Sequence, residues 1–106
     1  MILLSRAEEI ILLAVFKLKQ NAYGISIREL IKKETGVEWS FAQIYDPLNR
    51  LFQKGFVSKG KGESVPERGG RPKCLYAITR KGKAALLEIR AVQDSIWDNV
   101  SKNALS

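Results

Sequence analysis

The segment Gly60–Lys73 constrains the fold most, because its glycine and proline residues interrupt any helix or long strand. Short apolar runs flank it, over Phe56–Gly60 and Cys74–Ile78, and they cluster or alternate as residues of strands do. The chain is therefore predicted to form a β-hairpin around a Gly/Pro-rich connection, with helices only before and after it.

The net charge of the chain is concentrated in the same region. The chain carries +7 in total, and the thirty residues Lys54–Lys83 hold nine of its eighteen Lys and Arg side chains but only Glu63 and Glu67 of its acids. The remaining residues balance to zero. This local positive field favours contact with a polyanion, and nucleic acid is the usual one.

Capping boxes mark two of the helices that precede the hairpin. Ser5–Glu8 opens a helix that is predicted to extend to about Leu18, and Ser40–Gln43 opens another that ends at Gly55. The last helix is expected to begin after Thr79 and to extend to about Lys102.

A further helix lies between the two capping boxes and ends at Thr35, before a suitable left-handed cap at Gly36. The sequence leaves its start open. Ser26–Glu29 is a further capping box, but the helix is equally compatible with a start nearer Tyr23.

Composition excludes several classes of protein. A chain of 106 residues forms one domain, and without histidine it has no histidine base, metal ligand or catalytic dyad. The apolar run Ile10–Phe16 is too short to span a bilayer, and nothing resembles a signal peptide. Cys74 cannot form an internal disulfide. We expect a cytoplasmic protein that is not an enzyme, with no metal, cofactor or membrane contact.

The helix after Ser40 has two distinct faces at about 100° per residue. The predicted core arc consists of Phe41, Ile44, Tyr45, Leu48, Leu51 and Phe52. The predicted outer face consists of Ala42, Gln43, Asp46, Asn49, Arg50 and Gln53. Small and amide side chains of this kind suit hydrogen bonding to base edges in a major groove, although a solvated face is the alternative.

Two residues of this helix carry separate expectations. Pro47 removes a backbone donor, so a kink or an opened turn is expected there, on the outer side. Asp46 would repel phosphates, and we expect it to pair with Arg50 four residues later rather than to accept from a cytosine.

The order of these elements predicts the architecture. Three helices followed by a basic hairpin form a winged helix-turn-helix, in which the third helix enters the major groove. The predicted fold is mainly α with a small β-hairpin. Residues 1–79 form the DNA-binding part, and residues 80–106 form a long C-terminal dimerisation helix of the same domain.

From Leu4 to Leu87 the chain resembles the PadR-like transcriptional regulators. The motifs that carry the resemblance are Tyr23-Gly24, Ile44-Tyr45 with Leu48, Arg50-Leu51 and Gly55, and Glu67–Lys73 with Tyr76, Ile78-Thr79 and Gly82. Cys74-Leu75 and Phe52 depart from the family pattern. The resemblance implies a homodimeric DNA-binding regulator, most often a repressor, that dimerises through its last helix.

The predicted DNA contacts lie on the third helix and the hairpin. They are Ser40, Ala42, Gln43, Tyr45, Asn49, Arg50, Lys59, Lys61, Arg68, Gly69, Gly70, Arg71 and Lys73. The lysines and arginines of the hairpin are expected on phosphates or in a minor groove, where the glycine pair lets the backbone approach closely.

The last helix is more apolar than a lone projecting helix should be. Its predicted dimerisation residues are Leu86, Ile89, Val92, Ile96, Trp97 and Val100. Folding back onto its own core is the alternative. A two-fold dimer implies a roughly palindromic operator. Because some members of the resembled family bind aromatic effectors between subunits, Trp97 is a candidate contact for one.

Other roles stay open at this stage. A protein-interaction adaptor that keeps the winged helix is the alternative function, although the charge of the hairpin argues against it. Trp39 is expected to pack beneath the start of the third helix, with stacking on the DNA backbone as the alternative. Cys74 is expected to be a small strand residue, with a redox sensor as the alternative.

Overall fold

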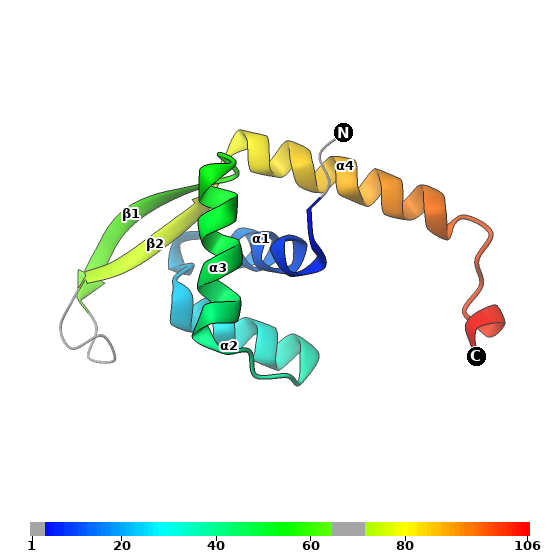
Figure 1. Ribbon diagram of the computed structural model, residues 1–106, viewed down its shortest axis with the longest axis horizontal. Helices are drawn as coiled ribbons and strands as arrows, with labels where there is room; N and C mark the ends of the chain where they lie inside the picture. The colour runs from blue at the N-terminus through cyan, green and yellow to red at the C-terminus, as the bar shows by residue number, and fades with distance from the viewer. Residues whose placement is uncertain (1–3, 65–71) are drawn as a thin grey trace.

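A computed structural model of the chain describes residues 4–64 and 72–106. The elements follow in the order α1 (Arg6–Leu18), η1 (Lys19–Asn21), α2 (Gly24–Thr35), α3 (Phe41–Gln53), β1 (Val57–Ser64), β2 (Pro72–Ile78), α4 (Arg80–Trp97) and η3 (Asn103–Leu105). The three N-terminal helices pack together, while the hairpin and α4 extend from this body in opposite directions (Figure 1). The molecule is therefore elongated, with extents of 52 × 29 × 20 Å. This is the predicted winged helix-turn-helix.

The first and third helices begin at their predicted capping boxes. The Ser5 hydroxyl accepts from the Glu8 amide, and the Ser40 hydroxyl accepts from the Gln43 amide. In each box the side chain three residues later, Glu8 or Gln43, accepts in turn from the backbone amide of the serine. Because these bonds span only three residues, the local sequence determines them.

The start of α2 is at the earlier of the two predicted positions. Ser26 is not its N-cap but lies in its first turn, where the buried hydroxyl accepts from the Tyr23 amide and donates to the Asn21 carbonyl. The capping box Ser26–Glu29 is thus wrong as a helix start. Gly36 ends the helix in the left-handed conformation, as predicted.

Fully buried side chains from the three helices and the start of the hairpin form one core. They include Ile11, Leu12, Ile27, Ile44, Leu48, Leu51 and Phe56. Trp39 packs against this core, which confirms its packing role, and its carbonyl accepts from Arg28 Nε at 2.6 Å. The position of α3 is therefore determined by contacts within the chain.

The hairpin is antiparallel and joined to the helical body by a backbone bond. Val57 pairs with Ile78, Lys59 with Tyr76, and Lys61 with Cys74. The Tyr76 amide donates to the Ala22 carbonyl at 2.8 Å, so the segment between α1 and α2 anchors β2. Both strands extend beyond their predicted limits toward the connection.

The last helix starts on the hairpin and projects away from the body. Thr79 caps it as predicted, and Gly82 lies against the Phe56 carbonyl, where any Cβ would collide with that backbone oxygen. The helix ends at Trp97, not near Lys102 as expected. Asp98 has an extended backbone and Asn99 a positive φ of 64°, a conformation that asparagine tolerates better than most residues.

Candidate nucleic-acid interface

The predicted outer face of α3 is exposed. Ala42, Gln43, Asp46, Asn49, Arg50 and Gln53 are all on the surface, while Ile44, Leu48 and Leu51 are buried. Figure 1 shows α3 as a continuous helix lying across the body beside the base of the hairpin. The helix thus presents small and amide side chains outward from a fixed position.

The ends of the predicted core arc were wrong. Phe41 is 45% exposed and Phe52 is 43% exposed. Phe41 lies under the Arg28 guanidinium at 4.6 Å, and Phe52 lies under Lys59 Nζ at 4.3 Å. Because cations from other elements cover these rings, the rings are stabilised at the surface without being buried in the core.

Pro47 is buried, so its side chain does not lie on the outer side, where a kink or an opened turn was expected. The helix continues through it from Phe41 to Gln53 without interruption. The pyrrolidine ring is apolar, so its burial does not leave a polar side-chain group without a partner.

Gln43 and Ser40 lie at the start of α3, and the capping box uses part of each side chain. Gln43 Oε1 accepts from the Ser40 amide at 2.7 Å, and Ser40 Oγ accepts from the Gln43 amide at 3.2 Å. Both residues are exposed at the N-terminal end of α3. The amide group of Gln43 keeps its donors available.

Tyr45 is half-buried, unlike the other predicted contacts on α3. Its ring lies on Gly24 at the start of α2, where any side chain at position 24 would collide with the ring and its hydroxyl. Tyr45 also stacks on Phe41, with ring centroids 6.3 Å apart. Its main contacts therefore hold α2 and α3 together.

Arg50 does not pair with Asp46. Its Nε lies 3.5 Å from Glu8 Oε2, and Lys54 Nζ donates to the same oxygen at 2.7 Å. The expected pair between Asp46 and Arg50 is absent from the ion pairs of the described residues. Arg50 is half-exposed, so its guanidinium reaches the surface while it is bound to α1.

Glu8 is a residue that the sequence marked only as part of a capping box. Its side chain is 5% exposed. Burial raises the pKa of the Glu8 carboxyl, but hydrogen bonds from Lys54 and Ser5 and the charge of Lys54 outweigh burial and hold the pKa below its ordinary value of 4.5. Glu8 is therefore a charged anchor between α1 and the end of α3.

Lysines of the hairpin lie next to aromatic rings of the helical body. Lys59 Nζ is over Phe52, and Lys73 Nζ is 4.6 Å from the centroid of Tyr23. Lys61 is exposed on β1 opposite the half-buried Cys74. The contact of Lys59 places one cationic group beside the end of α3. Arg68, Gly69, Gly70 and Arg71 lie outside the described residues.

The predicted dimerisation residues become more exposed toward the end of α4. Leu86, Ile89 and Val92 are partly buried, whereas Ile96 is 73% exposed and Trp97 is more than half exposed. Val100 is exposed and lies beyond the end of the helix.

An apolar groove between α1 and α4 was not predicted. Leu13 and Phe16 of α1 and Leu86 and Leu87 of α4 line it, and its volume is about 410 Å³. The signal was present in the run Ile10–Phe16, which is apolar on more than one side of its helix.

Within residues 4–64 and 72–106, no helix has both the length and the apolar composition needed to cross a bilayer.

Comparison with known proteins agrees with this geometry. The model of the transcriptional regulator PadR-like family matches residues 12–88. A PadR-like transcription factor from Bacteroides fragilis is 27% identical with a TM-score of 0.74, over 93% of this chain and 88% of that one. A PadR-like regulator from Bacillus cereus has the same fold, with 23% identity and a TM-score of 0.73 over 93% and 90% of the two chains. A search of curated proteins found no match.

Proposed function

The chain belongs to the PadR-like family of transcriptional regulators and is a DNA-binding regulator, and we propose that it represses transcription as a homodimer on a roughly palindromic operator. In this proposal α3 enters the major groove and the basic hairpin contacts the flanking backbone. Membership of a regulator family also supports a binding protein rather than an enzyme.

The orientation of α3 is the observation that carries the proposal. Ile44, Leu48 and Leu51 hold the helix on the core, so that Asn49 and its exposed neighbours point outward. Lys59 lies over Phe52 of this helix, and Lys61 is exposed further along the same strand of the hairpin. Amide side chains read base edges and lysines neutralise phosphates, so the two kinds of contact complement each other.

A dimer is supported by the apolar surface that one chain leaves exposed. Leu13 and Phe16 of α1 and Leu87 and Ile96 of α4 are all exposed. A second copy related by a two-fold axis would cover this surface and present two copies of α3 to one duplex. We assign the pairing to residues 80–106, which include α4, and the DNA contacts to residues 1–79. An aromatic effector beside Trp97 stays a prediction, and we place the protein in the cytoplasm.

Selection from a pool of random duplexes tests this function. We expect enrichment of a sequence with two related half-sites, bound by two chains per duplex in analytical ultracentrifugation. A reporter gene behind the enriched sequence should then be expressed less when the protein is present. No enrichment of any sequence would favour a protein-interaction adaptor, and increased expression would contradict repression.

A further inference from the structure

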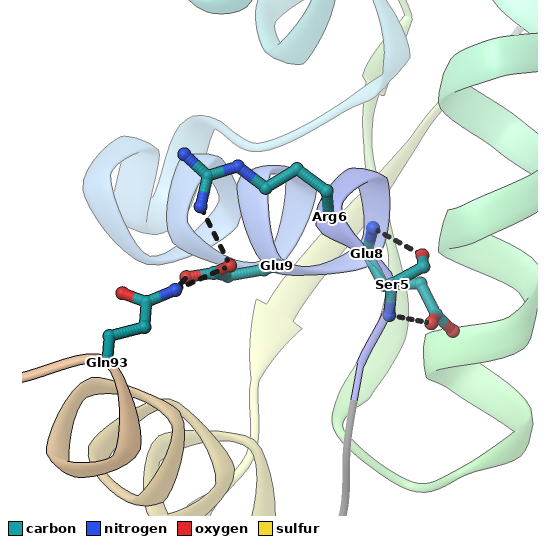
Figure 2. A network of polar contacts seen from close by, with 5 residues as sticks. All are labelled: Ser5, Arg6, Glu8, Glu9 and Gln93. Atoms are coloured by element: carbon teal, nitrogen blue, oxygen red, sulfur yellow. Dashed lines mark hydrogen bonds and ion pairs between the residues drawn. The ribbon is translucent and has the colours of Figure 1, made fainter. Parts of the chain in front are cut away.

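The first turn of α1 contacts two different helices through two consecutive carboxylates. Residues next to each other on a helix point about 100° apart, so Glu8 and Glu9 face different neighbours. Glu8 binds Lys54 and Arg50 at the end of α3. Glu9 binds Gln93 of α4 (Figure 2). One helical turn thus connects the proposed recognition helix with the proposed dimerisation helix.

The contact between Glu9 and Gln93 is specific in its geometry. Gln93 Nε2 donates to both carboxylate oxygens of Glu9, at 2.8 and 3.1 Å. The Glu9 side chain is only 13% exposed, and Arg6 NH1 contacts one of its oxygens at 3.4 Å. The contact joins a side chain of α1 to a side chain of α4, so it limits how far the two helices can move apart at this point.

Gln93 lies far along α4 from the other point at which this helix is attached. The base of α4 is held by the Thr79 cap, by the packing of Gly82 on Phe56 and by Ala85, which is buried in the core. Eight residues separate Ala85 from Gln93, which is about 12 Å along a helix. A helix held only at its base can pivot, whereas one held at two separated points has a fixed direction.

The apolar contacts between α1 and α4 cannot replace this second attachment. Leu13, Phe16, Leu86 and Leu87 line an open groove rather than a closed interface. Apolar contacts are not directional, so the side chains of such a groove tolerate small rotations of the helix. The hydrogen bonds from Gln93 to Glu9 depend on distance and angle, so they tolerate such rotations less well.

We propose that Glu9 and Gln93 are positioning residues that set the direction of α4 and, through it, the spacing of operator half-sites that the dimer accepts. This inference rests on the proposed function. In a dimer joined through α4, the direction of that helix determines the separation of the two α3 helices. Half-sites one helical turn apart are about 34–36 Å from centre to centre, so a small change of angle alters the fit.

The test uses the full chain and a series of duplexes. The operator enriched by the unmodified protein is remade with the half-sites moved by one or two base pairs in either direction. We expect the unmodified protein to prefer one spacing strongly. In Glu9→Ala and Gln93→Ala, this preference should fall by about fivefold or more, in the range of typical coupling between sites, while binding to a single half-site is unchanged.

Two further variants separate positioning from a general loss of structure. Glu9→Gln combined with Gln93→Glu exchanges the donor and the acceptor, and it should restore the spacing preference. Asp94→Ala removes a carboxylate next to Gln93 that pairs with Arg90 of the same helix, and it should have no effect. Gln93→Ala keeps a good helix former, so it remains testable even if Glu9→Ala is unstable.

The outcomes distinguish this inference from the function on which it rests. An unmodified protein that selects no pair of half-sites overturns the proposed function and this inference with it. A normal selection, followed by an unchanged spacing preference in both alanine variants, overturns the positioning role alone.

Discussion

The helices α3 and α4 are both amphipathic, but only α3 has its apolar side covered by its own chain. Ile44, Leu48 and Leu51 of α3 are fully buried, whereas Ala85 is the buried apolar side chain of α4 and Ile96 is largely exposed. The difference indicates that the chain folds the proposed DNA-reading surface by itself. The surface that would place two such helices on one duplex needs a second chain.

Of the changes considered, a charge at Ile96 should have the largest effect on this difference between α3 and α4. Ile96→Glu changes an exposed residue in the single chain, so we expect a folded protein. In the proposed dimer the same charge would be buried without a partner, at a cost of several kcal/mol. Sedimentation should therefore show a monomer, and binding to the two-half-site operator should be largely lost.

Ala91→Glu is the matched control, because position 91 is exposed on α4 and lies about 140° around the helix from Ile96. It should remain dimeric. If the unmodified protein is a stable monomer at micromolar concentration, the dimer model is wrong.

Removing charge from the hairpin should weaken binding to all duplexes alike. With Lys61, Arg68 and Arg71 changed to alanine, fewer counterions are released on binding. The slope of log affinity against log salt should fall by about 0.9 for each phosphate that the variant no longer neutralises. Fluorescence anisotropy across a salt series measures this slope.

Lys17, Arg90 and Lys102, changed together to alanine, remove the same charge from outside the hairpin and form the control. An equal change of slope in the two triple variants would show that overall charge, rather than the hairpin, controls the salt dependence.

Glu8 tests how firmly α3 is held within the chain. Glu8→Gln removes the charge that attracts Lys54 and Arg50, so the free energy of unfolding should decrease by about 1–3 kcal/mol near neutral pH. Because folding lowers the pKa of this carboxyl, its contribution is complete above the ordinary value of 4.5 and disappears as pH falls through the folded-state pKa. Urea unfolding at several pH values should show the two proteins converging in acid.

Glu34→Gln is the control, because that exposed carboxylate lies 4.0 Å from Lys17 on the surface. Its effect should be close to zero at every pH. A difference between Glu8→Gln and the unmodified protein that stays constant down to strongly acidic pH would contradict the assigned anchor.

Asn49 should give the smallest and most local effect. Asn49→Ala removes an exposed amide from the outer face of α3, so discrimination should fall by about 1–3 kcal/mol at one operator position. Affinity for unrelated duplexes and thermal stability should hardly change. Equal loss of affinity for every sequence would instead make Asn49 a contact to the DNA backbone.

Gln43→Ala should reduce discrimination between bases in the same way, and it should also lower the free energy of unfolding by about 1 kcal/mol, because it opens the capping box.

Local patterns in the sequence were sufficient for much of the fold. The boxes at Ser5 and Ser40 involve residues three apart, so the start of each helix follows from its own sequence. The pattern at Ser26 failed because a serine also suits the first turn of a helix. There the Ser26 hydroxyl accepts from the backbone amide of Tyr23, the residue that precedes α2.

Contacts between distant segments could not be predicted in the same way. Phe41 and Phe52 look like core residues on a helical wheel, but Arg28 and Lys59 cover them from other elements. Arg50 was expected to pair along its own helix, and its actual partner, Glu8, is more than forty positions away. A wheel describes one helix alone, so it contains no information about what neighbouring elements supply.

The capping bond at Gln43 has a consequence for the operator. A glutamine recognises adenine by donating to N7 and accepting from N6, and this requires its carbonyl oxygen. In Gln43 the Ser40 amide already uses one of the two lone pairs of that oxygen, so the side chain keeps both of its NH₂ donors but only one acceptor position. At this position the protein should prefer bases that present acceptors, such as the O6 and N7 of guanine. Adenine recognition by an amide on α3 is then better suited to Asn49 and Gln53, toward the opposite end of the helix.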